Sequence, residues 1–187
     1  NENPLGVSPK AIEAMQKEMA NCAYYPEGSS PRLRKKLAPL LGVGENQIFL
    51  ATGGDEILTL LGHAFVSEGD EVIMGSPSFF TSVTSTLVMG GKLIKIPVKG
   101  DDLSLDTEAI LAAITPKTKL IYFCNPNNPT GSIIGKEETA AFMSKVPDHC
   151  VVVFDEAYFE LVQDPNYPNG IDYVKQNAKV VGLGTFS

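Results

Sequence analysis

Residues 151–158 read VVVFDEAY, and this stretch decides the fold class of the chain. Four consecutive apolar residues predict a strand buried on both faces, because such a strand needs no polar residue at alternate positions. Two acidic residues and a tyrosine follow at once, so polar side chains stand where this strand ends. A strand of this kind is typical of a parallel sheet that is covered by helices.

Similar short apolar runs recur along the chain and alternate with helical patterns. The runs cover residues 48–51, 71–74, 93–96, 120–124, 151–154 and 180–183. The helical patterns between them cover residues 55–66, 79–89, 106–114 and 136–145, with Asp106 placed to cap the third. This alternation predicts an α/β fold, with a mainly parallel sheet and helices on both of its faces.

Two further helices are predicted before this alternation begins. Ser8-Pro9 and Ser30-Pro31 each read as a helix start, because serine is a good N-cap and proline suits the first helical position. Gly42 supplies the end of the second helix. The proline- and asparagine-rich residues 164–170 read as a surface loop. We therefore expect an N-terminal helical arm ahead of the sheet.

Composition argues against several classes of function. The 187 residues include 15 Lys plus Arg and 22 Asp plus Glu, and the resulting net charge of −7 argues against a nucleic-acid-binding surface. No stretch approaches the roughly 18 apolar residues that cross a bilayer, and the first residues carry no secretory signal pattern. The three cysteines stand far apart without a CxxC pair, which favours a reducing, cytoplasmic compartment.

Ligands of an open parallel sheet bind beyond the carboxyl ends of its strands, and unusual residues gather there in this chain. Gly53-Gly54-Asp55 opens a helix, where free N–H groups and the helix dipole favour a phosphate. A plain turn with Asp55 as N-cap explains the same residues. Residues 125–131 hold two prolines and three asparagines, which predicts a rigid turn. Such a turn could also hold an amide against a ligand.

Asp155 leaves a strongly apolar strand, and a carboxylate in that position needs a partner. A protonated pyridine nitrogen would serve, because proteins keep a pyridoxal ring protonated with an acidic residue at that nitrogen. Structural capping, or a metal role together with Glu156, are the alternatives. A nucleotide-binding acid would need a GxxxxGK[ST] loop, which the sequence lacks. The residues therefore favour a cofactor role for Asp155.

Taken together, these segments resemble the fold type I aminotransferases, which depend on pyridoxal 5'-phosphate (PLP). The matching motifs are Gly54-Asp55-Glu56, Asn128-Pro129-Thr130-Gly131, Asp155-Glu156-Ala157-Tyr158 and Thr185-Phe186-Ser187, in that order. Within that group the chain looks most like the histidinol-phosphate aminotransferases, through residues 1–6, 25–28 and 125–131. The resemblance covers essentially the whole chain.

The resemblance implies how the cofactor would be held. Its phosphate would bind to Gly54 and Asp55 at the helix start, joined by Ser187 with Thr185 beside them. Phe79 would stack on the pyridine ring, where the family often carries tyrosine, so the stacking is kept and a phenolic hydrogen bond is lost.

The resemblance also assigns the polar contacts of the ring. Asn128 and Tyr158 would hold its phenolic oxygen, and Asp155 would bind its nitrogen. Asp155 and Tyr158 would therefore be the catalytic residues of this chain. The implied reaction converts imidazole acetol phosphate and L-glutamate to histidinol phosphate and 2-oxoglutarate, a step of histidine biosynthesis.

A homodimer with shared active sites is a further implication. Tyr25 would reach the cofactor phosphate of the neighbouring subunit, and Asn1 and Asn3 would border the substrate pocket. Residues 1–28 would thus form an arm near that pocket and the dimer interface. Residues 29–187 would form the first part of the PLP-binding large domain.

The lysine that forms the Schiff base in this family directly follows the motif that ends at Ser187. We therefore expect the chain to be the N-terminal half of a longer transaminase, inactive by itself. An aromatic aminotransferase or a threonine-phosphate decarboxylase would use the same cofactor residues. A PLP-binding effector domain of a transcription regulator is another class of protein with this fold. A nucleotide-binding or non-enzymatic α/β domain is disfavoured by the missing GxGxxG pattern.

Overall fold

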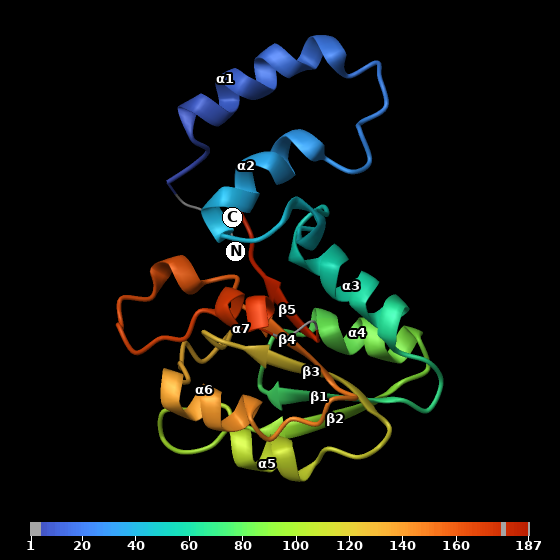
Figure 1. The fold of residues 1–187 in the computed structure, drawn as a ribbon, viewed down its shortest axis with the longest axis vertical. Helices are drawn as coiled ribbons and strands as arrows, with labels where there is room; N and C mark the ends of the chain where they lie inside the picture. Colours follow the sequence, from blue (N-terminus) through green and yellow to red (C-terminus); the bar gives the residue numbers. More distant parts are fainter. Residues whose placement is uncertain (1–4, 177–178, 187) are drawn as a thin grey trace. The chain divides into compact units, whose positions relative to one another are not determined.

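A computed structural model describes residues 5–176 and 179–186. The chain divides into two compact units, one of residues 1–50 with 186–187 and one of residues 51–185. All strands assigned within the described residues lie in the second unit, as Figure 1 shows. None of the helices in the described ranges is long and apolar enough to span a bilayer.

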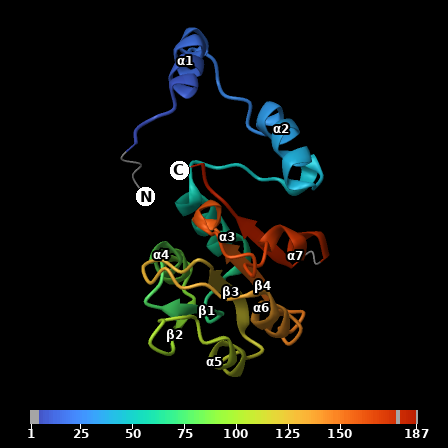
Figure 2. The same cartoon turned by 90° about the vertical axis from the view of Figure 1, so that its left-hand side faces the viewer.

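The first unit holds the two predicted N-terminal helices, α1 (Pro9–Glu18) and α2 (Pro31–Leu41), which Figure 2 shows as separate helices. Short 3-10 turns follow them, η1 (Met19–Asn21) and η2 (Glu45–Gln47). Both prolines stand at the helix starts as predicted, and Gly42 ends α2 in the left-handed region with φ 66°.

The apolar side of α1 is exposed within the described chain. Ile12 is 42% exposed, Met15 56% and Met19 69%. The periodicity of these residues correctly predicted a helix. It did not predict burial of that side, because burial requires a second surface to pack against.

The predicted strand at residues 48–51 is wrong. These residues form no strand, and the Phe49 side chain is 70% exposed. A short apolar run becomes a strand only where a neighbouring strand supplies its hydrogen bonds and a packed layer covers its side chains.

The second unit is built on a five-stranded parallel sheet, and the other five predicted strands are confirmed. The strands are β1 (Glu71–Ser76), β2 (Lys92–Pro97), β3 (Thr118–Cys124), β4 (Val151–Asp155) and β5 (Val180–Leu183). Their order across the sheet is β2-β1-β3-β4-β5. Every strand therefore ends at the same edge of the sheet.

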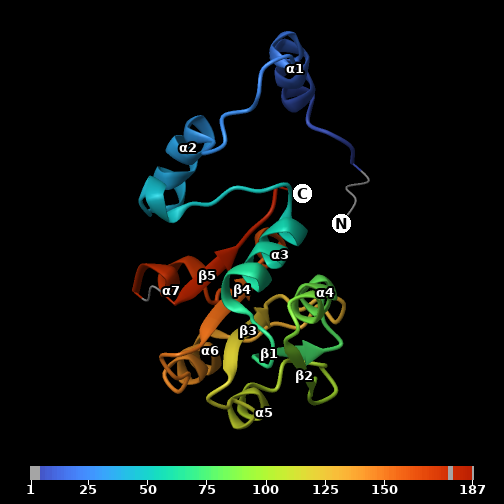
Figure 3. The ribbon, with the colours of Figure 1, turned by 90° about the vertical axis from the view of Figure 1, so that its right-hand side faces the viewer.

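Helices cover both faces of this sheet, as predicted. One core cluster joins the strands to α3 (Gly54–Phe65) and α4 (Thr81–Val88). The other joins them to α5 (Thr107–Ala112), α6 (Lys136–Met143) and α7 (Gly170–Gln176). Figures 2 and 3 place α4 and α5 on opposite sides of the strands.

Successive residues of β4 enter opposite clusters, because side chains alternate between the faces of a strand. Val152 and Phe154 pack with α6 and α7, while Val153 packs with α3. This double burial explains why the strand is apolar at every position.

The helices of this unit lie close to their predicted ranges, with one addition. Asp106 caps α5 as predicted, accepting a hydrogen bond from the Ala109 N–H at 3.0 Å. Helix α7 was not predicted, because it follows directly on the loop at residues 164–169 and begins with a glycine. Tyr173 of α7 stacks on Phe154 of β4 with ring centroids 5.2 Å apart. Tertiary packing therefore stabilises a helix with weak local signals.

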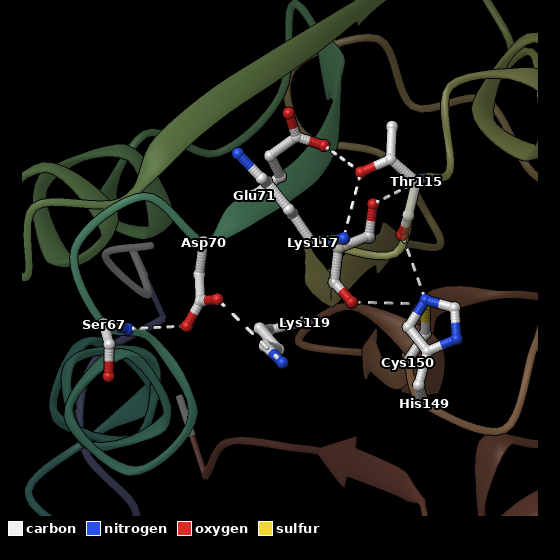
Figure 4. A network of polar contacts seen from close by, with 9 residues as sticks. Ser67, Asp70, Glu71, Thr115, Lys117, Lys119, His149 and Cys150 are labelled. Carbon is white, nitrogen blue, oxygen red and sulfur yellow. Dashed lines mark hydrogen bonds and ion pairs between the residues drawn. The ribbon is translucent and has the colours of Figure 1, made fainter.

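Polar contacts tie together the loops at the amino-terminal edge of the sheet (Figure 4). The Thr115 hydroxyl donates to the Glu71 carboxylate at 2.6 Å, and the Lys119 ammonium lies 3.9 Å from Asp70. The His149 Nε2 lies 3.0 Å from the Thr115 carbonyl oxygen. These residues precede or begin strands, so their contacts serve the fold at the edge opposite to the ends of the strands.

Candidate active site

The strand register brings three loops together at the carboxyl edge of the sheet. Cys124 pairs with Asp155, and Asp155 pairs with Leu183. Just beyond these pairs, the Asn125 N–H donates to the Asp155 carbonyl at 3.0 Å, and the Glu156 N–H donates to the Leu183 carbonyl at 2.9 Å. The segments that leave β3, β4 and β5 therefore begin side by side.

The start of α3 lies at this same edge. Gly53 is the N-cap, with φ 85° and ψ 175°, and it offers no side chain to the first amides of the helix. A Cβ on Gly54 would lie 3.4 Å from the Leu183 side chain and 3.7 Å from the Thr185 methyl group. The amino terminus of α3, with its partial positive charge, thus stands beside the end of β5.

Asp55 is not the N-cap that a plain turn would require. It lies in the first turn of α3, and its Oδ1 accepts a hydrogen bond from the Thr81 hydroxyl of α4 at 3.1 Å. The N-cap explanation of Asp55 is therefore wrong, because Gly53 occupies that position. The helix start retains the features that favour an anion.

Two of the three asparagines in the loop of residues 125–131 fix the loop itself. The Asn125 side chain pairs with the Ile134 main chain, donating at 3.1 Å and accepting at 2.9 Å. The Asn127 amide donates to the Pro77 carbonyl at 3.1 Å, and its oxygen accepts from the Ser78 hydroxyl at 2.8 Å. Both asparagines are buried, so the predicted turn is present and is held by hydrogen bonds of its own side chains.

The third asparagine of the loop is placed differently. Asn128 is half-buried, and its amide donates to the Tyr158 hydroxyl at 3.4 Å. A cavity of about 550 Å³ is lined by these two side chains together with residues 161–164. The two predicted ring-oxygen ligands are therefore neighbours beside an open space that a ligand could enter.

Asp155 is a buried carboxyl group at the end of β4, only 6% exposed. Burial raises its pKa to about 6, while the Ala157 N–H that donates to it at 3.3 Å lowers the pKa and the nearby Asp55 raises it. Within the described residues no lysine, arginine or histidine forms an ion pair with it. Asp155 is therefore a buried acid whose ionised form a cationic partner would stabilise.

Phe79 lies in the segment between β1 and α4, next to the Ser78 hydroxyl that Asn127 holds. Its ring packs against the cluster beneath α3 and α4, and its centroid is 5.5 Å from that of Phe80. The side chain is half-buried. Phe79 therefore shares the carboxyl edge, and its stacking on a pyridine ring stays a prediction.

Five further site residues were predicted from the sequence. Tyr25 belongs to the first compact unit, and its side chain is fully exposed. Thr185 follows β5 beside the start of α3. Asn1, Asn3 and Ser187 lie outside the described residues. The roles of these five residues stay predictions.

Two contacts near the site were missed by sequence reasoning. Ser78 links the segment after β1 to the loop after β3, and Glu156 forms a buried link between β4 and the start of α7. Glu156 is 6% exposed, and burial raises its pKa to about 7. The Asp155-Glu156 pair was a signal for a second buried acid, because both residues follow the same apolar strand.

Comparison with known proteins gives a consistent result. The family model for aminotransferase class I and II matches residues 1–187. A histidinol-phosphate aminotransferase of Brevibacillus brevis is 43% identical over 187 residues, which is all of this chain and 51% of that protein. A similar enzyme of Moorella thermoacetica is 42% identical over 188 residues and is covered for 48% of its length.

Solved structures resemble the chain over its whole length. The crystal structure of a putative histidinol-phosphate aminotransferase from Erwinia carotovora atroseptica has a TM-score of 0.92 at 28% identity, with 55% of that chain covered. The histidinol-phosphate aminotransferase from Sinorhizobium meliloti, in complex with pyridoxal-5'-phosphate, has a TM-score of 0.90 at 28% identity, with 50% covered. The chain spans about half the length of the curated relatives that it matches.

Proposed function

Since this chain belongs to the class I and II aminotransferase family, we propose that it forms part of a PLP-dependent transaminase acting on histidinol phosphate. The whole protein would interconvert imidazole acetol phosphate plus L-glutamate and histidinol phosphate plus 2-oxoglutarate. The choice of substrate is supported by curated histidinol-phosphate aminotransferases that are 37% to 44% identical over the full chain.

The observation that carries this proposal is the place of Asp155. A buried carboxyl group without a described cationic partner stands at the edge of the sheet where α3 begins. The protonated ring nitrogen of PLP is the partner that this position fits. A charge-assisted hydrogen bond to such a group contributes about 1.5–3 kcal/mol.

When bound, PLP supplies an electron sink for the electron pair left behind by the departing Cα proton of the substrate. Asp155 would keep the ring nitrogen protonated. The first amides of α3, at Gly54 and Asp55, would bind the cofactor phosphate. Asn128 and Tyr158, which already contact each other at 3.4 Å, would hold the phenolic oxygen.

Other residues complete the proposed site. Phe79 would stack on the ring, and Thr185 and Ser187 would lie at the phosphate. We further propose a cytoplasmic homodimer in which Tyr25 reaches the partner's cofactor phosphate and Asn1 and Asn3 border the substrate. In this scheme the Schiff-base lysine follows Ser187 in the longer protein.

The first prediction concerns Asp155→Asn in the whole protein. We expect transamination between histidinol phosphate and 2-oxoglutarate to fall roughly a hundredfold or more, which is typical of losing a positioned proton-holding group. PLP should still bind, because the phosphate contacts remain. Steady-state rates and a PLP titration followed by absorbance measure the two effects.

The same assay separates the alternatives for the substrate. Faster turnover with aromatic amino acids would identify an aromatic aminotransferase, and release of CO₂ from threonine phosphate would identify a threonine-phosphate decarboxylase. Either result would contradict histidinol phosphate as the substrate.

Near-normal rates in the Asp155→Asn variant would refute the assigned role of Asp155. Lys119→Gln is a suitable control, because Lys119 lies at the opposite edge of the sheet.

A further inference from the structure

A buried chain of polar groups lies next to Asp155 and is not used by the proposed mechanism. The Oε1 atom of Glu156 accepts a hydrogen bond from the Gly170 N–H at 2.9 Å and lies 3.2 Å from the Tyr167 hydroxyl. The same hydroxyl donates to the main-chain carbonyl oxygen of Asn125. The chain thus joins three segments, which are the end of β4, the loop before α7 and the loop after β3.

Counting protons along this chain constrains the state of Glu156. The Tyr167 hydroxyl has one proton, and the Asn125 carbonyl oxygen can only accept. If Glu156 is ionised, three oxygen atoms share a single proton, so one of the two oxygen–oxygen contacts has no hydrogen bond. If Glu156 is protonated, it donates to Tyr167 and Tyr167 donates to Asn125, and both contacts are satisfied.

We propose that Glu156 is a positioning residue that is protonated in the folded protein at mildly acidic pH and, in that state, holds through Tyr167 the main chain of the loop that carries Asn128. This inference rests on the proposed function only for its consequence, which is the placement of Asn128 beside Tyr158. The protonation of Glu156 and the tethering of the loop are properties of this chain by itself.

The surroundings of Glu156 favour the neutral acid. The titratable groups that face it are Tyr167, Asp155 and Glu160, and both carboxylates raise its pKa. Burial contributes most to the rise, and hydrogen bonds from Gly170 and Tyr167 act against it. In the described part of the chain, no basic side chain forms an ion pair with Glu156.

The main chain closes tightly over this carboxyl group. A Cβ at Gly170 would lie 2.5 Å from the Oε2 atom of Glu156 and 3.1 Å from the Cβ of Phe154. A side chain at this position would displace the Glu156 carboxyl group, so the glycine permits the close approach by which its N–H reaches Glu156. This close fit leaves little room for the water that an ionised carboxylate would need.

Tyr167 is the residue that links Glu156 to the loop of residues 125–131. Asn125 is already tied through its N–H to Asp155 and through its side chain to Ile134. Its carbonyl oxygen is bonded to Tyr167, and Asn128 follows three residues later. Loss of this link should loosen residues 125–128 without unfolding the sheet.

Infrared difference spectroscopy of the cofactor-free whole protein tests the protonation. At pH 6, one unit below a pKa of about 7, the wild type should show a protonated carboxyl C=O band that is absent from Glu156→Gln. In the wild type this band should fade by pH 8. At pH 6 the band should still be present in Asp155→Asn, which shows that it does not arise from Asp155, an acid with a pKa of about 6. Absence of a band assignable to Glu156 at pH 6 would overturn the proposal.

Amide hydrogen exchange, corrected for the intrinsic effect of pH, tests the tethering. The probes are the N–H of Gly131, which donates to the Asn127 carbonyl, and the N–H of Ile134, which donates to the Asn125 side chain. At pH 6, Tyr167→Phe should exchange both about tenfold faster, as expected for a lost buried hydrogen bond. Tyr173→Phe is the matched control, because its ring stacks on Phe154 outside this chain of hydrogen bonds.

The pH dependence of this exchange separates positioning from simple packing. Wild-type protection of the loop should weaken as the pH rises through about 7, whereas protection in Glu156→Gln should not change over that range. A pH-independent wild type, or unchanged protection in Tyr167→Phe, would refute the tether. Absence of transaminase activity in the wild-type whole protein would instead refute the proposed function and would leave these two measurements intact.

Discussion

At the scale of single residues, Asp155 is the group whose chemistry is most altered by the fold. Its pKa rises from an ordinary value of 3.8 to about 6, mainly because it is buried. Between pH 3.8 and about 6, the folded protein therefore keeps a proton on Asp155 that the unfolded chain has released. Stability from this group is fully present below pH 3.8 and is lost as the pH rises towards 6.

This sign gives the second prediction, for the cofactor-free protein. Between pH 4 and 7 the free energy of unfolding of the wild type should fall relative to that of Asp155→Asn, by on the order of 2–3 kcal/mol in total. Urea denaturation at a series of pH values measures the difference. Both proteins carry Glu156→Gln in this comparison, because Asp155 raises the pKa of Glu156 and the two titrations would otherwise overlap. Parallel curves would mean that Asp155 is ionised throughout.

The asparagines of residues 125–131 show how far single residues could be assigned from sequence. The composition of residues 125–131 predicted a rigid turn and left a ligand role open. The structure divides the two roles, with Asn125 and Asn127 buried as parts of the turn and Asn128 turned to Tyr158. The division depends on partners such as Ser78, which lies 49 positions away from Asn127. The residues next to Asn127 in the sequence do not indicate such a distant partner.

At the scale of elements, the start of α3 is the feature on which the proposed phosphate site depends. Gly53 adopts φ 85°, a conformation that side chains with a Cβ rarely adopt, and a Cβ there would meet no atom within 4 Å. The requirement for glycine is therefore one of backbone conformation alone.

The third prediction follows because a side chain at Gly53 would change only the backbone conformation and would clash with no neighbouring atom. Gly53→Ala should lower the free energy of unfolding by roughly 1–2 kcal/mol and should weaken phosphate binding by tilting the first turn. Gly184→Ala is the matched control, because that glycine is equally open but has no positive φ. Urea unfolding and titration with inorganic phosphate measure the two effects. Equal stability of both variants would contradict the assignment.

Helix α7 and residues 48–51 mark the limit of local signals at this scale. The first became a helix with weak signals because Tyr173 and Val174 pack on the sheet. The second stayed without strand structure despite its apolar run. In both cases the deciding contribution is packing against segments distant in sequence.

At the scale of the whole molecule, the sheet of the second unit is stabilised by aromatic packing on one face. Phe123 is fully buried in the centre of that face, with its ring centroid 5.1 Å from that of Phe142 and 5.2 Å from that of Phe154. These contacts join α6 to β3 and β4, the two strands that residues 125–131 and 156–158 directly follow. The stability of the site and that of this core are therefore linked.

The fourth prediction tests this core. Phe123→Ala should lower the free energy of unfolding by about 3–5 kcal/mol, the range for deleting a buried phenylalanine. Phe49→Ala, at a 70% exposed position, should change it by less than about 0.5 kcal/mol. Both are measured by urea denaturation followed by circular dichroism. Similar losses in the two variants would show that Phe49 is covered by a surface outside the described chain.

The sequence by itself determined the alternation of strands and helices, the cap at Asp106 and the edge of the sheet at which Gly54, Asn128 and Asp155 gather. These features depend on periodicity and on neighbouring residues, which are written in consecutive positions. The tertiary structure alone decided which asparagines are structural, that Glu156 is buried and that Tyr167 reaches the loop of residues 125–131. Those contacts join residues that are up to 50 positions apart, and their partners are chosen by the packing of the whole sheet.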